Sequence, residues 1–311
     1  MNRTATVLVN PAAGADRRED VTTALREIIA AAGITARVVP LTAPAQIPAA
    51  VRDAIASGTD VIAAAGGDGT VSTVAAAMLG METALAVLPL GTLNHFAKDL
   101  GIPLDLPEAV RAIAAGRIVA VDVGEVNGRP FLNNSSIGVY PDIVVARDGL
   151  RQEGRGKWAA TLIASARILI RYRGLTVRVT TKDNTRAVRT PFVFVGNNQY
   201  QVEGLRFGRR MRLDAGKLVA YLAPCVHARD LPFLAALALL GRKTVKPVLE
   251  SFPAGSLIVE TPGRRRLRVA LDGEVTQMMP PLEYRVRPKA LNVVVPAPSG
   301  EVVHDHDTPA R

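Results

Sequence analysis

The stretch VIAAAGGDGT, Val61–Thr70, decides how the first part of the chain folds. Its first five residues are small and apolar without polar alternation, which predicts a strand buried on both faces, as in a parallel sheet covered by helices. The glycines that follow predict a tight turn, and Val71–Leu79 is expected to form a helix that ends at Gly80. A strand, a glycine turn and a helix in succession form one unit of an α/β fold.

Similar units surround this stretch. Strands are expected at Thr6–Asn10, Ala36–Val39, Val61–Ala65, Leu85–Leu88 and Ile118–Val123. Helices are expected at Glu19–Ala32, Ile47–Ser57, Val71–Leu79 and Leu106–Ala115. Short strands separated by helices predict a Rossmann-like parallel α/β domain over residues 1–125.

The pattern changes near Val126, where strand signals follow one another with turns between them. The expected strands are Leu175–Thr180, Phe192–Val195, Leu218–Leu222, Ser256–Glu260, Leu267–Leu271, Tyr284–Val286 and Leu291–Val295. Two helices are expected within this region, at Trp158–Tyr172 and Asp230–Leu240. Residues 126–296 therefore read as an antiparallel β-sandwich whose final strand could return to the first domain, and residues 297–311 as a disordered tail.

Composition narrows the possible partners. Among 311 residues, Lys and Arg outnumber Asp and Glu by 38 to 28, a net charge of +10 that suits a nucleotide or an anionic lipid surface. No nucleic-acid-binding motif is recognisable, so no nucleic-acid partner is expected. The single cysteine, Cys225, excludes a disulfide within the chain, and no apolar run approaches the ~20 residues of a membrane span. We expect a cytoplasmic protein that associates peripherally with the inner face of the membrane.

The turn Gly66–Thr70 has the features of a phosphate-binding loop. It lies at the carboxyl end of a parallel strand, where ligands bind in open α/β sheets. Glycines allow backbone N–H groups to approach an anion, and the following helix adds its positive N-terminal end. Asp68 would repel phosphates unless a cation lay between them, which suggests Mg²⁺. The alternative is a plain strand–helix turn in which Asp68 caps the helix.

Two further turns repeat this arrangement. Pro89–Asn94 follows the next strand and would place Thr92 and Asn94 across from the first loop. Asn10–Gly14 closes the first strand. Three such turns at the ends of neighbouring parallel strands predict a nucleotide-binding crevice.

The motifs together resemble the diacylglycerol kinase catalytic-domain family, which includes bacterial lipid kinases and the sphingosine and ceramide kinases. The matching segments are Val9–Pro11, Gly66–Thr70, Leu88–Asn94, Asn133–Asn134, Ser136–Gly138, Gly196–Asn198 and Leu271–Glu274. The resemblance implies an α/β nucleotide-binding domain followed by a β-sandwich. It also implies transfer of the γ-phosphoryl group of ATP, with Mg²⁺, to the hydroxyl of diacylglycerol or a related lipid. A homodimer is compatible with it.

The resemblance also implies roles for individual residues. The ATP contacts would be Asn10, Pro11, Gly14, Thr42, Gly66, Gly67, Asp68, Gly69, Thr70, Thr92 and Asn94. The catalytic residues would be Asp272, Glu274 and Asp68, with the general base either Asp272 or Glu274, and the metal ligands would be Asp68, Asp122 and Asp214. His95 and Ala215 occupy positions where relatives carry acids. With His95, a magnesium network that includes Asp68 and Asp122 would lose one anionic member. With Ala215, either Asp214 completes a structural Mg²⁺ site with backbone carbonyls or that site is empty. Loops such as Tyr140–Trp158 are expected to shape the acceptor site.

The segment Leu271–Glu274 supports two interpretations. On an extended segment, residues two apart face the same side, which would direct Asp272 and Glu274 into one cleft. Asp-Gly is also a common hairpin turn, in which case the segment simply joins two strands.

Two other functions remain open. An NAD kinase shares the Gly66–Thr70 loop, but its expected Asn-Glu pair is replaced here by Asn134-Ser135. A nucleotide-regulated membrane-binding protein that has lost catalysis would be consistent with His95 and Ala215.

Overall fold

The computed structural model describes residues 4–10, 18–152, 163, 168, 174–203, 206–223 and 249–297. Pro11, Gly14, the helix predicted at Asp230–Leu240 and the tail beyond Ala297 lie outside the described residues, as does nearly all of the helix predicted at Trp158–Tyr172. Within the described ranges, no helix is long and apolar enough to cross a membrane.

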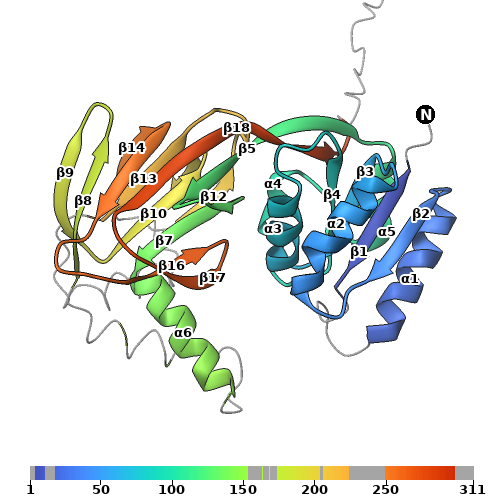
Figure 1. The fold of residues 1–311 in the computed structure, drawn as a ribbon, viewed down its shortest axis with the longest axis horizontal. Helices are drawn as coiled ribbons and strands as arrows, with labels where there is room; N and C mark the ends of the chain where they lie inside the picture. The colour runs from blue at the N-terminus through green and yellow to red at the C-terminus, as the bar shows by residue number, and fades with distance from the viewer. Residues whose placement is uncertain are drawn as a thin grey trace, which may run out of the picture.

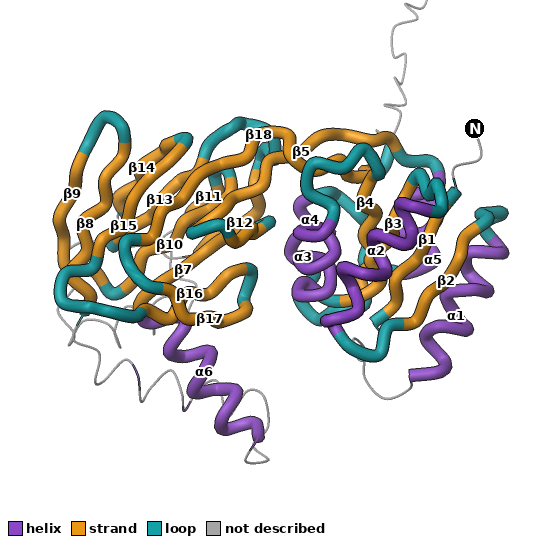
Figure 2. Tube along the Cα trace, viewed as in Figure 1, coloured by secondary structure: helices purple, strands orange, loops and turns teal. Residues whose placement is uncertain are grey.

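The first part of the chain alternates strands and helices as expected. In chain order it contains β1 (Ala5–Val9), α1 (Arg18–Ala31), β2 (Ala36–Pro40), the 3-10 turn η1 (Pro44–Gln46), α2 (Ile47–Ala56), β3 (Val61–Gly66), α3 (Asp68–Ala77), β4 (Ala84–Pro89), α4 (His95–Asp99) and α5 (Leu106–Ala114). The strands lie in the order β2-β1-β3-β4 and are mutually parallel. Helix α2 packs beside α3 and α1 beside α5, so the two faces of the sheet are covered (Figure 2).

The second part is built of antiparallel strands and one described helix. Its elements are β6 (Arg129–Phe131), β7 (Asn134–Gly138), α6 (Val139–Gln152), β8 (Leu175–Thr181), β9 (Thr185–Thr190), β10 (Phe192–Asn197), β11 (Tyr200–Glu203), β12 (Arg206–Arg210), β13 (Leu218–Leu222), β14 (Glu250–Ala254), β15 (Ser256–Glu260), β16 (Leu267–Leu271) and β17 (Glu274–Met278). One sheet has the order β14-β13-β10-β7-β16-β17, and the facing sheet contains β15, β8 and β9. The core between them is aliphatic, as in a sandwich.

Two long strands, β5 (Arg117–Val126) and β18 (Leu282–Val295), connect the two parts (Figure 1). Strand β18 pairs with β4 at one end and with β15 at the other, so the parallel sheet and one sheet of the sandwich form a single ten-stranded sheet. Val293 of β18 lies in the first core and Tyr284 in the second. Strand β18 thus contributes to both sheets, while the domain bounds expected from the sequence stay a prediction.

Strand β5 corrects the prediction of a fifth parallel strand at Ile118–Val123. It pairs antiparallel with β18 from Arg117 to Val126, and β18 itself runs parallel to β4. Strand β5 therefore runs against the first four strands. The apolar pattern located the strand but carried no information about its direction, because its partner β18 comes from the far end of the chain.

Candidate active site

Four turns meet at one edge of the first sheet. Because β1, β2, β3 and β4 are parallel, the residues that follow them lie at the same carboxyl edge. These residues are Asn10, Thr42, the turn Gly66–Thr70 and the turn Gly91–Asn94. The structure thus brings together all the described residues that the sequence assigns to nucleotide binding.

The turn after β3 presents the start of helix α3. Gly67, the N-cap, is extended and provides no side-chain acceptor for the first N–H groups of the helix, which is the arrangement that binds anions. A Cβ at Gly66 would come within 2.6 Å of the Thr70 side chain, so this position requires glycine. Thr70 is buried, and its hydroxyl accepts a hydrogen bond from Asn10 Nδ2 at 2.9 Å. This bond connects the turn after β1 to the turn after β3.

The turn after β4 packs directly on this loop. Leu90 N donates to Gly66 O at 3.0 Å, and a Cβ at Gly91 would lie 2.6 Å from Gly67 Cα. Asn94 is buried in a left-handed conformation (φ 50°) and closes its own turn, accepting from Gly91 N at 3.0 Å and donating to Gly91 O at 2.8 Å. Its amide therefore shapes the turn, while Thr92 is exposed at the tip.

Thr42, at the end of β2, is exposed at the same edge. Its backbone N–H and its hydroxyl both donate to Gln46 Oε1, at 2.8 and 3.1 Å. The hydroxyl is thus oriented by the 3-10 turn η1.

The segment Leu271–Glu274 is a hairpin turn, which corrects the extended interpretation. Leu271 pairs with Glu274 across β16 and β17, and both turn residues have positive φ, 48° for Asp272 and 92° for Gly273. This is the two-residue turn for which Asp-Gly is favoured. Both carboxylates reach helix α3, Glu274 at Gly69 and Asp272 at Ser72, but only Asp272 also binds the loop at residues 132–134.

Four donors surround the Asp272 carboxylate. Oδ1 accepts from the backbone N–H groups of Asn133 at 2.7 Å and Asn134 at 3.1 Å. Oδ2 accepts from Leu132 N and from Ser72 Oγ, each at 2.8 Å. These contacts use the roughly four lone-pair sites of a carboxylate. Burial raises the pKa of Asp272 above its ordinary value, although the four donors oppose that shift.

Glu274 has a contrasting environment. The residue is exposed, and a Cβ at Gly69 would overlap its Oε1 atom, so the carboxylate lies against the first turn of α3. Glu274 is thus the carboxylate of the pair that is both accessible and adjacent to the glycine turn.

The three carboxylates predicted as metal ligands occupy different places. The described residues contain no group of three or more His, Cys, Asp or Glu side chains that could hold a metal ion. Asp122 is buried, and its carboxylate accepts from Lys289 N at 2.9 Å, Gly216 N at 2.6 Å and Asn198 Nδ2 at 3.1 Å. Asp214 is exposed and paired with Arg212 at 3.1 Å, and the Arg212 hydrogen bond lowers the Asp214 pKa.

Asp68 fits a cation better than the other two. It is half-buried at the first position of α3, among the N–H groups that would hold phosphates. Mg²⁺ is commonly bound by one or two carboxylates together with substrate phosphates, so a single protein carboxylate at this position suffices.

Sequence reasoning missed Ser72, which donates to the Asp272 carboxylate. It lies four residues after Asp68, hence on the same face of α3, and this spacing was the available signal. It also missed Asp99 and Arg210, whose side chains form a buried ion pair at 2.8 Å. No local pattern indicated that pair.

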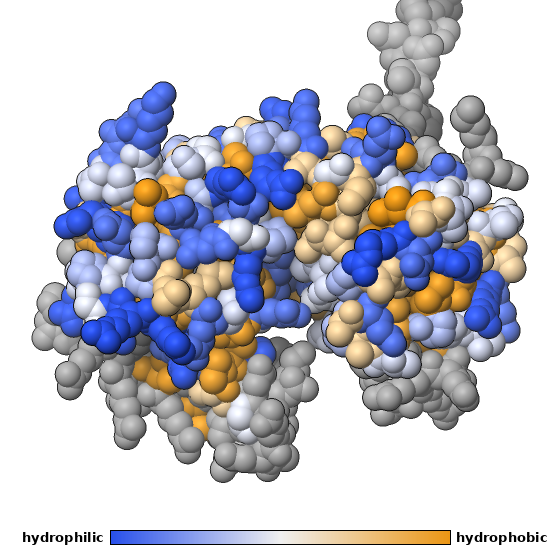
Figure 3. Space-filling view, in the orientation of Figure 1, coloured by the Kyte–Doolittle hydropathy of each residue, from blue (hydrophilic) through white to orange (hydrophobic). Residues whose placement is uncertain are grey.

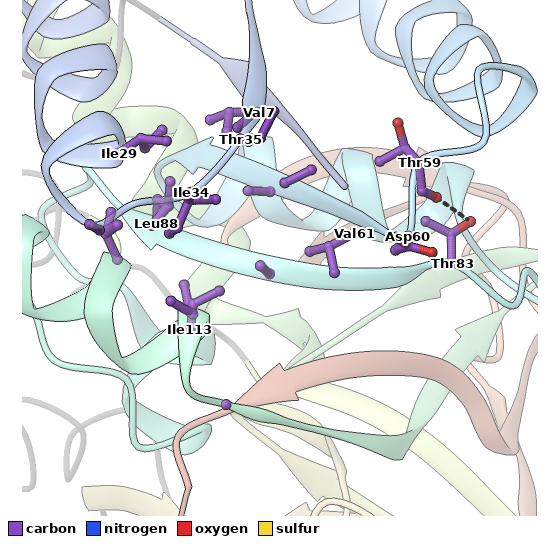
Figure 4. A pocket seen from close by; sticks show the side chains of 18 of the residues that line it. Val7, Ile29, Ile34, Thr35, Thr59, Asp60, Val61, Thr83, Leu88 and Ile113 are labelled. Atoms are coloured by element: carbon purple, nitrogen blue, oxygen red, sulfur yellow. Dashed lines mark hydrogen bonds between the residues drawn. The ribbon is translucent and has the colours of Figure 1, made fainter. Parts of the chain in front are cut away.

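A large cavity lies away from these turns. It has a volume of about 1090 Å³ and lies at the amino-terminal edge of the sheet, with Ile29 on α1 and Ile113 on α5 on its walls (Figure 4). Thr83 Oγ1 donates to Thr59 O at 3.5 Å at its rim. None of the residues of the four turns lines it.

In the space-filling view, the surface is indented between the two parts of the molecule, below the level of β5 and β18 (Figure 3).

Known proteins match this chain over both of its parts. The model of the diacylglycerol kinase catalytic domain matches residues 4–126, and that of the YegS C-terminal NAD kinase beta sandwich-like domain matches residues 142–295. A Pseudomonas aeruginosa protein named "Probable lipid kinase YegS-like" is 31% identical over 252 residues, which cover 80% of this chain and 81% of that protein. The chain belongs to the diacylglycerol kinase catalytic-domain family. As a member of this family it is a lipid kinase.

Other family members agree over shorter or more divergent alignments. A Citrobacter koseri protein of the same name is 40% identical over 87 residues, 27% of this chain and 29% of that protein. A solved structure of a diacylglycerol kinase from Bacillus anthracis str. Sterne superposes with a TM-score of 0.69 at 21% identity, covering 96% of this chain and 97% of that one. At that identity the likeness supports the fold alone.

Proposed function

We propose that this lipid kinase transfers the γ-phosphoryl group of ATP to the hydroxyl of diacylglycerol or a related lipid, with Glu274 as the general base. The position of Glu274 carries this proposal, because it is an exposed carboxylate against Gly69 of the glycine turn. Asp272, the other candidate base, already accepts four hydrogen bonds and has no vacant lone-pair site for a lipid proton. Asp272 instead positions the loop at residues 132–134.

In the proposed reaction, the lipid hydroxyl gives its proton to Glu274 while its oxygen attacks the γ-phosphorus in line. The bond from that phosphorus to the bridging oxygen breaks, and ADP leaves with the electron pair. The N–H groups at the start of α3 stabilise the charge on the phosphoryl oxygens. Asn10 orients the Thr70 hydroxyl in the same crevice.

Magnesium would be held with the nucleotide by Asp68. When bound, it would neutralise charge on the phosphates. Asp122 and Asp214 fit this role less well, since the first is buried and already accepts from three neutral donors and the second is paired with Arg212.

The test is a transfer assay with labelled ATP and a panel of lipids in anionic micelles, including diacylglycerol, sphingosine, ceramide and phosphatidylglycerol. Glu274→Gln should lower transfer by about 10²–10⁴-fold, the usual contribution of a general base, while ATP affinity stays nearly unchanged. Glu27→Gln, on the exposed face of α1, is the matched control. Full turnover by Glu274→Gln would refute the assignment, and phosphorylation of added NAD instead of lipid would support the NAD kinase alternative.

We further propose that the enzyme works at the inner face of an anionic membrane, as a peripheral cytoplasmic protein. The net charge of +10 supports this, because basic residues near an anionic surface are attracted to it. Sedimentation with vesicles should depend on their anionic lipid and weaken with salt. ATP consumption that rises when lipid vesicles are added would separate a kinase from a pure binding protein.

A further inference from the structure

We infer that Arg210 is a positioning residue for phosphoryl transfer, acting with Asp99 to fix the loop at residues 132–134 relative to the nucleotide turns. Asp99 ends helix α4, which begins directly after the turn Gly91–Asn94. Arg210 ends strand β12 of the second part. The inference deepens the proposed function, on which it rests, by identifying what holds the acceptor side of the crevice in register with the nucleotide side.

The Arg210 guanidinium is fully buried and donates four hydrogen bonds. Its Nε donates to Asp99 Oδ2 at 2.8 Å, and its Nη1 donates to Leu132 O at 2.7 Å and Asn197 O at 3.0 Å. Its Nη2 donates to Asn133 Oδ1 at 2.8 Å. The side chain of Arg210 has no solvent exposure and that of Asp99 is 7% exposed, so the pair is shielded from screening by water.

Arg210 and Asp272 bind opposite sides of the same loop. Arg210 takes the Leu132 carbonyl and the Asn133 amide oxygen, whereas Asp272 takes the backbone N–H groups of Leu132, Asn133 and Asn134. Tyr200 adds a third restraint, its hydroxyl donating to Asn133 O at 3.1 Å beneath the Arg210 guanidinium. The loop is therefore held by charge from both sides.

Two contacts between the parts then close a ring around the crevice. Ser72 joins α3, the helix of the first glycine turn, to Asp272. Asp99 joins α4, the helix of the second turn, to Arg210. The two glycine turns also touch each other at Gly67 and Gly91. These connections therefore fix the position of the hairpin that carries Glu274 relative to both glycine turns. Loss of either connection should shift Glu274 relative to the γ-phosphate without removing any nucleotide contact.

Two conservative variants test this. Arg210→Lys keeps the charge but loses the planar fork that reaches Asp99, the loop carbonyls and Asn133 together. Asp99→Asn keeps the size and an acceptor but loses the ion pair. Should Arg210→Lys fail to fold, Asp99→Asn, which removes no atoms from the core, still provides the test. Arg186→Lys is the control, because Arg186 on β9 makes a similar forked pair with Glu250 on β14, and this pair is exposed and contacts neither glycine turn nor the loop at residues 132–134.

The expected result is a split between rate and nucleotide affinity. A displacement of about 1 Å at the reacting groups lowers turnover by about 10²-fold, so kcat should fall by that order while the KM for ATP stays within about threefold. Arg186→Lys should leave both unchanged. Unchanged kcat in folded Arg210→Lys or Asp99→Asn would overturn the inference. A rise in the KM for ATP that accounts for the whole loss of kcat/KM would overturn it as well.

Hydrogen exchange separates this inference from the proposed function. Amides of residues 132–134 should lose protection in both variants and keep it in Arg186→Lys, irrespective of any lipid. Unchanged protection of these amides would by itself refute the inference that Arg210 and Asp99 fix the loop. Failure of the unaltered protein to phosphorylate any lipid of the panel would refute the proposed function, while the exchange result would still report whether Arg210 fixes the loop.

Discussion

Replacement of Gly91 by alanine tests whether the two glycine turns form one nucleotide site. The added Cβ would lie 2.6 Å from Gly67 Cα and 2.8 Å from Asn94 Oδ1. Ordinary contact begins at 3.4 Å, so the turns must separate by roughly 0.8 Å. Both obstacles are held in place, the first by the backbone of the neighbouring turn and the second by its bonds to Gly91.

The size of the effect follows from this geometry. Overpacking of this kind costs about 1–3 kcal/mol of folding stability. A shift of nearly 1 Å at a catalytic site costs about 10²-fold in turnover. Because Gly67 belongs to the turn that would bind the phosphates, we expect Gly91→Ala to weaken ATP binding as well as to lower kcat.

A graded series makes the test specific. At Gly67 the added Cβ would lie 3.4 Å from Gly91 Cα, at the limit of ordinary contact, and at Gly255 nothing lies within 4 Å. ATP affinity measured by calorimetry and kcat measured with lipid micelles should therefore fall in the order Gly255→Ala, Gly67→Ala, Gly91→Ala. Equal ATP affinity in Gly91→Ala and Gly255→Ala, with both proteins folded, would refute the idea that contact between the turns shapes the site.

Three further predictions concern charge and ligand. Ser72→Ala removes a donor that lowers the Asp272 pKa, so that pKa should rise further above the ordinary value of about 3.9. Activity needs ionised Asp272 to hold residues 132–134, so as pH falls the variant should lose activity at a higher pH than the unaltered protein does. An unchanged pH dependence of activity on the acid side would contradict the role of Asp272. Glu125→Gln should lower the free energy of unfolding by about 1 kcal/mol in urea titrations, because the buried Glu125 carboxylate accepts from Arg285 Nε at 2.6 Å, although that arginine is 65% exposed. ATP with Mg²⁺ at about 100 times its Kd should raise the unfolding free energy by about 2.7 kcal/mol, and Asp68→Asn should reduce this gain at low Mg²⁺.

The first sheet was largely predictable because its signals are local. An apolar run such as Val61–Gly66 has few alternatives to a buried strand, and the glycine turn after it fixes where the helix begins. The direction of β5 and the joining of the two sheets were not predictable, because both depend on β18, which is distant in sequence. Helix α6 replaces part of the expected loop Tyr140–Trp158; its Pro141 suits a first helical turn, but the sequence lacks a strong apolar stripe.

In the candidate site, too, local features were predictable and contacts between distant segments were not. Positions of the glycine turns followed from the strands that precede them, whereas the orientation of Asp272 depended on partners such as Ser72, 200 residues away. The Asp99–Arg210 pair spans 111 residues and leaves no periodic trace. Asp-Gly at positions 272 and 273 was ambiguous by itself, and the structure shows a hairpin turn. The turn encloses the Asp272 carboxylate between Ser72 and the loop at residues 132–134, and leaves Glu274 exposed against α3.

Strand β18 has a consequence for how the protein is made. Its 14 residues are synthesised long after β4, yet they provide the neighbour of β4 in the first sheet and of β15 in the second. During synthesis, N-terminal domains usually fold first, at about 5–20 residues per second of chain growth. Here the parallel sheet would wait on the ribosome with the edge of β4 unpaired until β18 emerges. Completion of the first sheet is thereby timed to synthesis of the second part of the molecule.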